Sequence, residues 1–205
     1  VFINGEFYGL NNLREYLDNN YFLNGHGIIE ENLDLIRGID VEYGTGQRYK
    51  EVADLCEKGG FESPHEMALF EEMVDIATFR DVFVTNVVSN NSDMLPKNTL
   101  WYRNNAATGA ENDMFYSILV DQDKGWAHPL ASSSSSPAFN SINYYLNDTT
   151  APATPYLRCF QAAMQNIDFE TDFLNRTADV LNTFFAPERT LSIIEKIKTE
   201  YEPHY

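Results

Sequence analysis

Four oxygen-bearing side chains follow one another along the chain in an order that suits phosphoryl transfer. Asp93 is followed five residues later by Asn98, and the carboxylates of Asp121 and Asp123 come after the next two predicted strands. The first carboxylate can orient a hydroxyl group and accept its proton, while the amide and the later carboxylates can hold metal ions that bridge phosphates. Mg²⁺ and Mn²⁺ prefer such oxygen ligands. Segment 90–126 is therefore the candidate site.

Each of these residues also has a simpler interpretation. The spacings Asp-x-x-x-x-Asn and Asp-x-Asp arise by chance in acidic chains. Residues 90–93 could form an Asx-type turn that ends a helix, and Asp121 and Asp123 could be a solvated strand end. The strands between them favour a site, but spacing alone leaves both interpretations open.

Rigid elements are predicted on both sides of Asp93. Asp75 can cap a long helix, in which Ile76, Phe79 and Phe83 recur at the three- and four-residue spacing of a buried face. Strands are predicted at 99–103 and 115–120, where β-branched and aromatic residues gather. A loop between a buried helix and a strand would hold Asp93 on a firm support.

The remaining pattern indicates an α+β chain whose C-terminal two thirds is mostly helical around one small β element. A hairpin is predicted at 1–10 because Asn4-Gly5 is a strong two-residue turn signal. A short strand or a turn is expected at 32–37, and the serine run 132–136 should be a surface loop. Helices are expected at 11–20, at 47–58, after the Ser63-Pro64 start signal, and from Pro155 onward in two or three pieces, the last beginning at Pro187.

Composition bounds the class of protein. The chain has 205 residues with 43% hydrophobic and 14% aromatic content, which is enough for a packed core. Its net charge of −17 argues against unaided binding to nucleic acid, because phosphate backbones need a basic surface. The same charge suits a protein that binds divalent cations, or simply a soluble acidic surface.

Several single residues have more than one interpretation. Cys56 and Cys159 lack metal spacing, and either one disulfide or two buried thiols is expected. Trp101 and Trp126 are expected in the core, and Arg176 should join helices through a buried carboxylate. No run reaches the roughly 20 apolar residues of a membrane span.

Five segments, in order, resemble the spore-coat CotH kinase family over almost the whole chain. The family patterns are N-G-E-Y-x-G-x-Y-x-L-x-E, N-L-D-L-L, N-x-D-W-x-x-N-N-x-x-x-Y-R, W-D-x-D-x-G-x-G and F-R-x-x-F-x-x-R. The matching residues here are FINGEFYGLNNLRE at 2–15, NLDLI at 32–36, NSD and NTLWYR within 91–103, ILVDQDKG at 118–125, and DFE and FLNR within 168–176.

The resemblance implies an atypical protein kinase with a bilobal, protein-kinase-like fold that uses ATP with Mg²⁺ or Mn²⁺ and acts on a protein substrate. By position, Asp93 would be the catalytic base, and Asn98, Asp121 and Asp123 would be metal ligands. Residues 1–15 would be the end of the N-lobe and the hinge, with Glu15 near the nucleotide, and residues 16–205 would be the C-lobe. The same resemblance implies a secreted or cell-surface location, as in a spore coat.

The chain departs from the family pattern at several positions. The phosphate-binding lysine of such a kinase would precede Val1, so the domain is expected to be N-terminally incomplete. Met94 replaces the aromatic residue after the first Asp, and residues 124–126 are Lys-Gly-Trp where the family pattern has Gly-Phe-Gly. Lys97 is near the Asp93 loop, where it could contact a phosphate or could simply be a solvent-exposed lysine.

Three functions are therefore compared. An active kinase would transfer the γ-phosphoryl group of ATP to Ser or Thr of a secreted or surface protein. A non-catalytic binding or scaffold module would keep the fold without turnover. A calcium-stabilised surface domain would use the same aspartates, and Ca²⁺ would raise its melting temperature while nucleotide would not.

Overall fold

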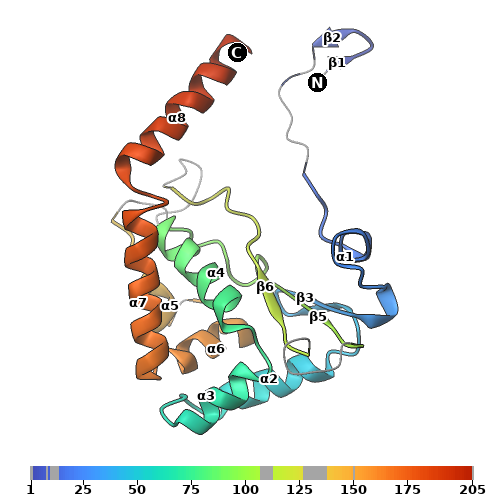
Figure 1. Ribbon diagram of the computed structural model, residues 1–205, viewed down its shortest axis with the longest axis vertical. Helices are drawn as coiled ribbons and strands as arrows, with labels where there is room; N and C mark the ends of the chain where they lie inside the picture. Colours follow the sequence, from blue (N-terminus) through green and yellow to red (C-terminus); the bar gives the residue numbers. More distant parts are fainter. Residues whose placement is uncertain are drawn as a thin grey trace.

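The computed structural model describes residues 2–7, 9, 14–106, 113–126, 138–149 and 151–204. These residues form an α+β structure with eight α-helices and a four-stranded antiparallel sheet (Figure 1). The serine run 132–136 and most of the link between the two predicted central strands lie outside the described residues. The expected mixture of a small β element and a mostly helical C-terminal part is confirmed.

The N-terminal hairpin forms where the sequence predicts it. Strand β1 (Phe2–Ile3) pairs antiparallel with β2 (Glu6–Phe7). Asn4 and Gly5 make the turn with φ of 51° and 85°, the left-handed geometry that suits the twist of a hairpin. In Figure 1 the hairpin lies apart from the body.

The helix predicted at 11–20 is wrong in position. Helix α1 covers Asn19–His26, and residues 14–17 are not helical. Asp18 begins the helix because its carboxylate accepts hydrogen bonds from the backbone N–H groups of Asn20 (2.9 Å) and Tyr21 (3.1 Å). A capping residue that the sequence offered was therefore missed.

The central sheet has the order β4-β3-β5-β6 with antiparallel neighbours throughout. It contains β3 (Leu33–Arg37), β4 (Asp40–Tyr43), β5 (Leu100–Asn104) and β6 (Tyr116–Ile118). The predicted strands β3, β5 and β6 are confirmed, although β6 is shorter than expected, and β4 was not predicted. A short 3₁₀ helix, Glu30–Asn32, leads into β3.

The turn between β3 and β4 requires glycine. Gly38 has φ of 63°, and a Cβ atom placed there would lie 2.6 Å from the carbonyl oxygen of Pro96. The β3–β4 turn therefore packs directly against the loop that carries Asn98.

The predicted helices that precede Asp93 are confirmed. Helix α2 covers Gln47–Glu57, α3 covers Pro64–Glu71 and α4 covers Ile76–Val88. Ser63 and Asp75 cap α3 and α4, and the Asp75 carboxylate accepts the N–H of Thr78 at 2.7 Å. Helix α4 packs against α7 and β6, so it is the buried support of the loop that follows it.

The C-terminal part contains α5 (Ser141–Asn147), α6 (Pro155–Ala163), α7 (Ile167–Asn182) and α8 (Pro187–Tyr201), followed by a 3₁₀ turn at Glu202–His204. The last three helices are as predicted, and α5 was not predicted. Arg176 on α7 joins α4 as predicted, with its Nη2 atom 2.8 Å from the carboxylate of Asp81, but that carboxylate is half-exposed and not buried. Helix α8 has no buried residue and extends away from the body (Figure 1).

Aromatic side chains fill the main core between α4, α6, α7 and the sheet. Phe83 stacks on Phe160 with ring centroids 3.9 Å apart, and Trp101 stacks on Phe115 at 5.5 Å. Trp101 is 2% exposed, as predicted. Trp126 is 55% exposed, so its predicted core position is wrong. Its ring lies 5.0 Å from that of Phe185, at the surface.

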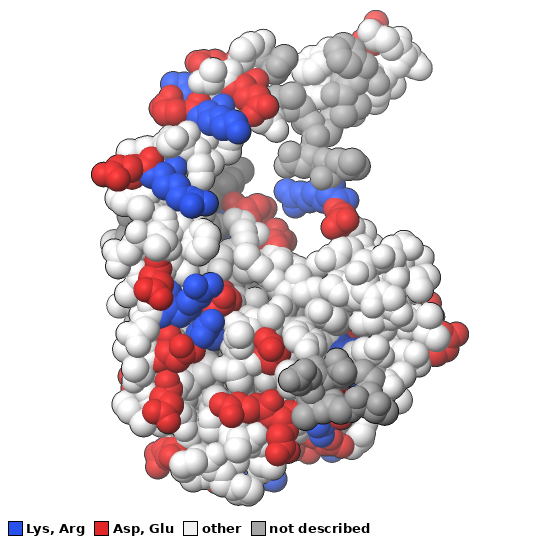
Figure 2. Space-filling model, viewed as in Figure 1, with Lys and Arg blue, Asp and Glu red and all other residues white. Residues whose placement is uncertain are grey.

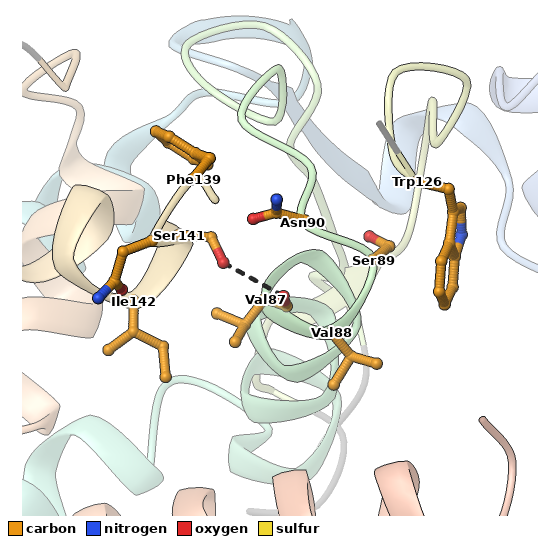
Figure 3. Close-up of a pocket in the computed structure, with 9 residues that line it drawn as sticks. Val87, Val88, Ser89, Asn90, Trp126, Phe139, Ser141 and Ile142 are labelled. Carbon is orange, nitrogen blue, oxygen red and sulfur yellow. Dashed lines mark hydrogen bonds between the residues drawn. The ribbon is translucent and has the colours of Figure 1, made fainter. Parts of the chain in front are cut away.

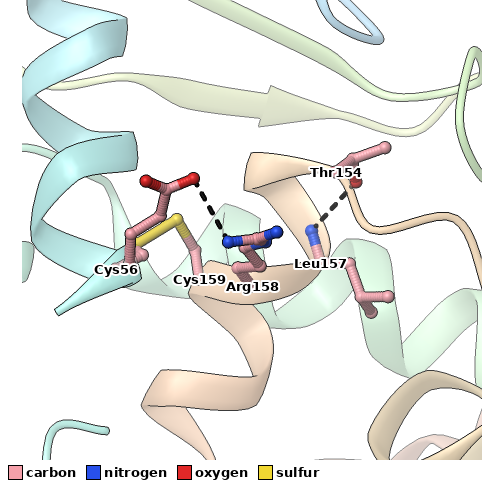
Figure 4. Close-up of a disulfide and its surroundings, with 6 residues drawn as sticks. Cys56, Thr154, Leu157, Arg158 and Cys159 are labelled. Carbon is pink, nitrogen blue, oxygen red and sulfur yellow. Dashed lines mark hydrogen bonds and ion pairs between the residues drawn. A yellow bond between two sulfur atoms is a disulfide. The ribbon is translucent and has the colours of Figure 1, made fainter. Parts of the chain in front are cut away.

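Cys56 on α2 and Cys159 on α6 form a disulfide across 103 residues of sequence (Figure 4). Of the two alternatives that the sequence left open, the disulfide is the one observed. Both cysteines are buried, and the adjacent ion pair between Arg158 and Glu57, at 3.2 Å, joins the same two helices.

Candidate active site

The loop after α4 presents Asp93 through a local turn. Asn91 is fully buried, and its Oδ1 atom accepts the backbone N–H of Asp93 at 3.0 Å. This is the Asx-type turn that was the simpler interpretation of these residues. The turn and the site are compatible, because the turn fixes the backbone from which the Asp93 carboxylate projects.

Asp93 and Asn98 are in direct contact. The Nδ2 group of Asn98 donates to the backbone oxygen of Asp93 at 2.8 Å and to its Oδ2 atom at 3.1 Å. Since the nitrogen faces Asp93, Oδ1 is the Asn98 atom that could bind a cation. Lys124 also binds Oδ2 of Asp93, with its Nζ atom at 2.9 Å.

The second acidic segment follows β6. Asp121 and Asp123 are exposed and their carboxyl groups share a hydrogen bond, while Gln122 between them is half-buried. Partial desolvation, this hydrogen bond and the charges of Asp123 and Asp93 raise the pKa of Asp121 above its ordinary 3.8, although Arg14 opposes the change. A cation placed between these carboxyl groups would reduce the repulsion between their charged forms.

Hydrogen bonds to backbone oxygens hold the loop after α4 and the segment after β6 side by side. The Nδ2 group of Asn91 reaches the backbone oxygen of Asp121 at 3.4 Å, and the N–H of Trp126 donates to the backbone oxygen of Ser89 at 2.6 Å. Asn90, Asp121 and Trp126 have positive φ values of 56°, 49° and 62°. Left-handed conformations cost free energy in residues other than glycine, and they gather at functional sites more than elsewhere.

The residues of this site suit a hard divalent cation, provided that phosphates supply further ligands. Within the described residues, no group of three His, Cys, Asp or Glu side chains is arranged to hold a metal ion. Mg²⁺, however, is usually held by one or two carboxylates together with substrate phosphates, rather than by a complete protein cage. Asp121, Asp123 and the amide oxygen of Asn98 are ligands of the chemical type that such a cation accepts.

A comparison with protein families matches residues 1–205, the whole chain, to the family described as CotH kinase protein. The chain belongs to the CotH kinase family. Membership indicates a kinase-like function and thus a transferase. A comparison with curated proteins and another with solved structures found no match. No helix in the described part of this family member is long and apolar enough to cross a membrane.

Two residues predicted to contact nucleotide in this CotH kinase family member lie outside the cluster around Asp93. Lys97 is exposed, and its Cα atom packs near Gly38. Glu15 lines a separate pocket of about 370 Å³ beside α1, together with Tyr16 and Tyr21. In the described residues, no hydrogen bond or ion pair joins Lys97 or Glu15 to Asp93, and their roles remain predictions.

Lys124 is the cation that sequence reasoning missed. It is 31 residues from Asp93 in sequence, and only the packing of the two loops brings them together. The hydrogen bond and charge of Asp93 raise the pKa of Lys124 above its ordinary 10.5, with Asp123 and Asp121 adding to the effect. A lysine directly after the Asp121-Gln122-Asp123 segment was the available signal.

A pocket of about 610 Å³ opens next to the Asp93 loop (Figure 3). It lies between the C-terminal end of α4, the N-terminal end of α5 and Trp126. The Oγ atom of Ser141 donates to the backbone oxygen of Val87 at 3.2 Å and ties the two helices together there. Its lining residues are Val87, Val88, Ser89, Asn90, Trp126, Phe139, Asn140, Ser141 and Ile142.

Acidic side chains dominate the surface around the body. Figure 2 shows red Asp and Glu side chains in several groups over this face, with smaller blue groups of Lys and Arg between them. Such a field attracts metal cations and repels free nucleotide anions.

Proposed function

We propose that this chain is the catalytic part of an atypical protein kinase, which transfers the γ-phosphoryl group of ATP to a Ser or Thr hydroxyl of a secreted or surface protein. The observation that carries this proposal is the contact of the Asp93 loop with the Asp121–Asp123 turn, in a chain of the CotH kinase family. A protein-kinase-like fold belongs to the same proposal, with residues 1–15 as the end of the N-lobe and the hinge and 16–205 as the C-lobe.

Asp93 is the proposed catalytic base. Asn98 and Lys124 both bind its Oδ2 atom, so we assign Oδ1 to the acceptor hydroxyl. As the hydroxyl oxygen bonds to the γ-phosphorus, its proton passes to Asp93 and the bond between the γ-phosphorus and the bridging oxygen breaks, which releases ADP. Such a base contributes about 10²–10⁴-fold to the rate.

Asp121, Asp123 and Asn98 are the proposed ligands for Mg²⁺ or Mn²⁺. A bound cation would neutralise and orient the phosphates of ATP. The two neighbouring carboxyl groups already raise the pKa of Asp121, so a cation would relieve a repulsion that the fold imposes. Gln122 points inward between them, which leaves both carboxylates on the exposed side of the turn.

Lys124 is the proposed contact for the transferring phosphoryl group. Its ammonium group binds Asp93 and lies near the carboxylates of Asp121 and Asp123, whereas no hydrogen bond or ion pair joins Lys97 to these three carboxylates in the described part of the chain. A cation at this point would balance the negative charge that collects between the nucleotide and the acceptor. Glu15 and Lys97 remain secondary candidates for nucleotide contact.

The proposed acceptor is a protein outside the cytoplasm. The Cys56–Cys159 disulfide supports this location, because structural disulfides persist in oxidising compartments. The pocket at α4, α5 and Trp126 adjoins the Asp93 loop and combines aromatic with amide and hydroxyl groups, so it could receive residues next to the acceptor hydroxyl.

The test is phosphate transfer from γ-labelled ATP, with Mn²⁺ or Mg²⁺, to a Ser/Thr peptide library and to the protein itself. Asp93→Asn should lower the rate by about 10²–10⁴-fold, and Asp121→Asn should abolish metal-dependent turnover. Asp179→Asn, the same chemical change on the exposed face of α7, is the matched control and should have no effect. Equal rates in all four proteins would refute the assignment.

A non-catalytic binding module is the second candidate. It is favoured by the ion pair in which Lys124 neutralises Asp93, and by the lack, within the described residues, of a three-ligand metal cluster. Calorimetric titration separates the two functions. Absence of heat with millimolar ATP and Mn²⁺ would support the module, whereas saturable binding that Asp121→Asn removes would support the kinase.

A further inference from the structure

A buried amide network lies beneath the candidate active site. Asn86 is fully buried on α4, and its Nδ2 group donates to the backbone oxygen of Val82 at 2.8 Å. Its Oδ1 atom accepts two further hydrogen bonds, from Nδ2 of Asn91 at 3.0 Å and from Nε2 of Gln122 at 3.1 Å. Two amide donors therefore converge on one oxygen, and they come from the two different loops of the site.

The first loop is fixed through Asn91. Its backbone N–H donates to the backbone oxygen of Asn86 at 2.9 Å, and its backbone oxygen accepts the hydroxyl of the buried Tyr145. Its Oδ1 atom holds the N–H of Asp93, and its Nδ2 group also reaches the backbone oxygen of Asp121. If Asn86 no longer accepted from Asn91, this side chain would be free to turn, and the Asp93 backbone would lose its fixed partner.

The second loop is fixed through Gln122. Its Nε2 group donates to Asn86 and to the backbone oxygen of Val120 at 3.2 Å, while its Oε1 atom accepts the hydroxyl of Ser89 at 3.3 Å. Because the Gln122 side chain points inward and is half-buried, the side chains on either side of it, Asp121 and Asp123, are exposed. The anchor thus decides which way both carboxylates face.

We propose that Asn86 is a positioning residue, which holds the Asp93 loop and the Asp121–Asp123 turn in register through Asn91 and Gln122. Its role is indirect, because its side chain hydrogen-bonds to Asn91, to Gln122 and to a backbone oxygen, and not to the candidate site residues themselves. The proposal rests on the phosphotransfer function proposed above. Unpaired amide donors are costly when buried, so removal of the shared acceptor should move both loops.

Two variants separate the two branches of the network. Asn86→Leu keeps a similar volume and removes the shared acceptor, so kcat and the apparent Mn²⁺ affinity should both fall by about 10–100-fold. Gln122→Met removes only the turn anchor. It should raise the Mn²⁺ concentration for half-maximal rate by about tenfold and leave kcat at saturating Mn²⁺ within about threefold of the unmodified protein.

Phe173→Leu is the matched control for general loss of core packing. Phe173 is fully buried on α7 and contacts Phe160 at 5.3 Å between ring centroids, away from the network. Assayed well below its melting temperature, this variant should keep both kinetic parameters. Equal losses in Phe173→Leu and Asn86→Leu would overturn the proposal. If Asn86→Leu does not fold, Gln122→Met decides, and an unchanged Mn²⁺ dependence would overturn it.

Hydrogen exchange tests the network without any need for activity. In Asn86→Leu the backbone amide of Asp93 should exchange at least about tenfold faster, while that of Val180 on α7 should be unchanged. If the unmodified protein transfers no phosphate but these exchange rates behave as stated, the kinase proposal fails and the network stands. Unchanged exchange at Asp93 would overturn the role of Asn86.

Discussion

The Cys56–Cys159 disulfide should be one of the largest single contributions to the stability of this fold. It joins α2 to α6 across 103 residues, and cross-linking a loop of about 100 residues lowers the entropy of the unfolded chain by an equivalent of about 4.7 kcal/mol. Both cysteines are already buried, so reduction alone changes core packing little. Loss of the bond should therefore act mainly through the unfolded state.

Urea unfolding in the presence and absence of dithiothreitol measures this contribution. With a denaturant slope of about 2–3 kcal/mol per molar, the midpoint should fall by about 2 M on reduction. The double variant Cys56→Ser/Cys159→Ser should unfold near the reduced protein and should not respond to dithiothreitol. Arg158→Met is the control, because it removes the half-exposed ion pair between the same helices and should cost no more than about 1 kcal/mol.

Two results would refute this reasoning. If the native protein releases two titratable thiols before any reductant is added, the bond does not form. If the bond is present but reduction moves the midpoint by less than about 0.5 M, the disulfide does not stabilise the fold mainly by lowering the entropy of the unfolded chain.

Three further predictions concern the site and its supports. Lys124→Met should lower the rate of phosphate transfer on the order of 100-fold without shifting the melting temperature, whereas Lys97→Met should leave the rate within about threefold; equal effects would exclude a special role for Lys124. Gly38→Ala should cost more than about 2 kcal/mol in urea unfolding, because φ is 63° and the new Cβ would meet a carbonyl oxygen at 2.6 Å; an unchanged midpoint would contradict this. Arg176→Met should lower stability by up to about 1 kcal/mol at pH 7. Burial raises the pKa of Asp81, but hydrogen bonds from Arg176 and Arg80 outweigh this effect and hold the pKa below 3.8. The stability difference between the two proteins should therefore be full above pH 3.8 and vanish as pH falls through the lowered pKa. A difference that persists at about pH 2 would contradict this pairing.

The elements that the sequence predicted well are those decided by local chemistry. Ser63 and Asp75 cap their helices through their own side chains, and Asn4-Gly5 forms its turn within four residues. The misplaced first helix is also local, since Asp18 caps α1 and was overlooked. Local signals of this kind survive folding because no distant contact is needed to satisfy them.

The missed elements depend on tertiary context. Residues of β4 are exposed at the edge of the sheet, so they have no continuous buried run to mark a strand. Helix α5 is a short helix of seven residues whose main anchor is the buried Tyr145. Within the site, the order of Asp93, Asn98 and Asp121 was visible, but their partners were not. The ion pair of Lys124 with Asp93, and the hydrogen bond that Gln122 donates to Asn86, form only after β5 and β6 pack back against α4.

The unequal placement of the two tryptophans supplies a built-in optical reporter. Trp101, on strand β5, is buried in the core, whereas Trp126 is 55% exposed and lies two residues beyond Lys124. A soluble quencher such as acrylamide will reach the second indole and spare the first, so their emission can be told apart. Any cation or nucleotide that rearranges the turn will then change the red-shifted component, and the unlabelled protein will itself report what it binds.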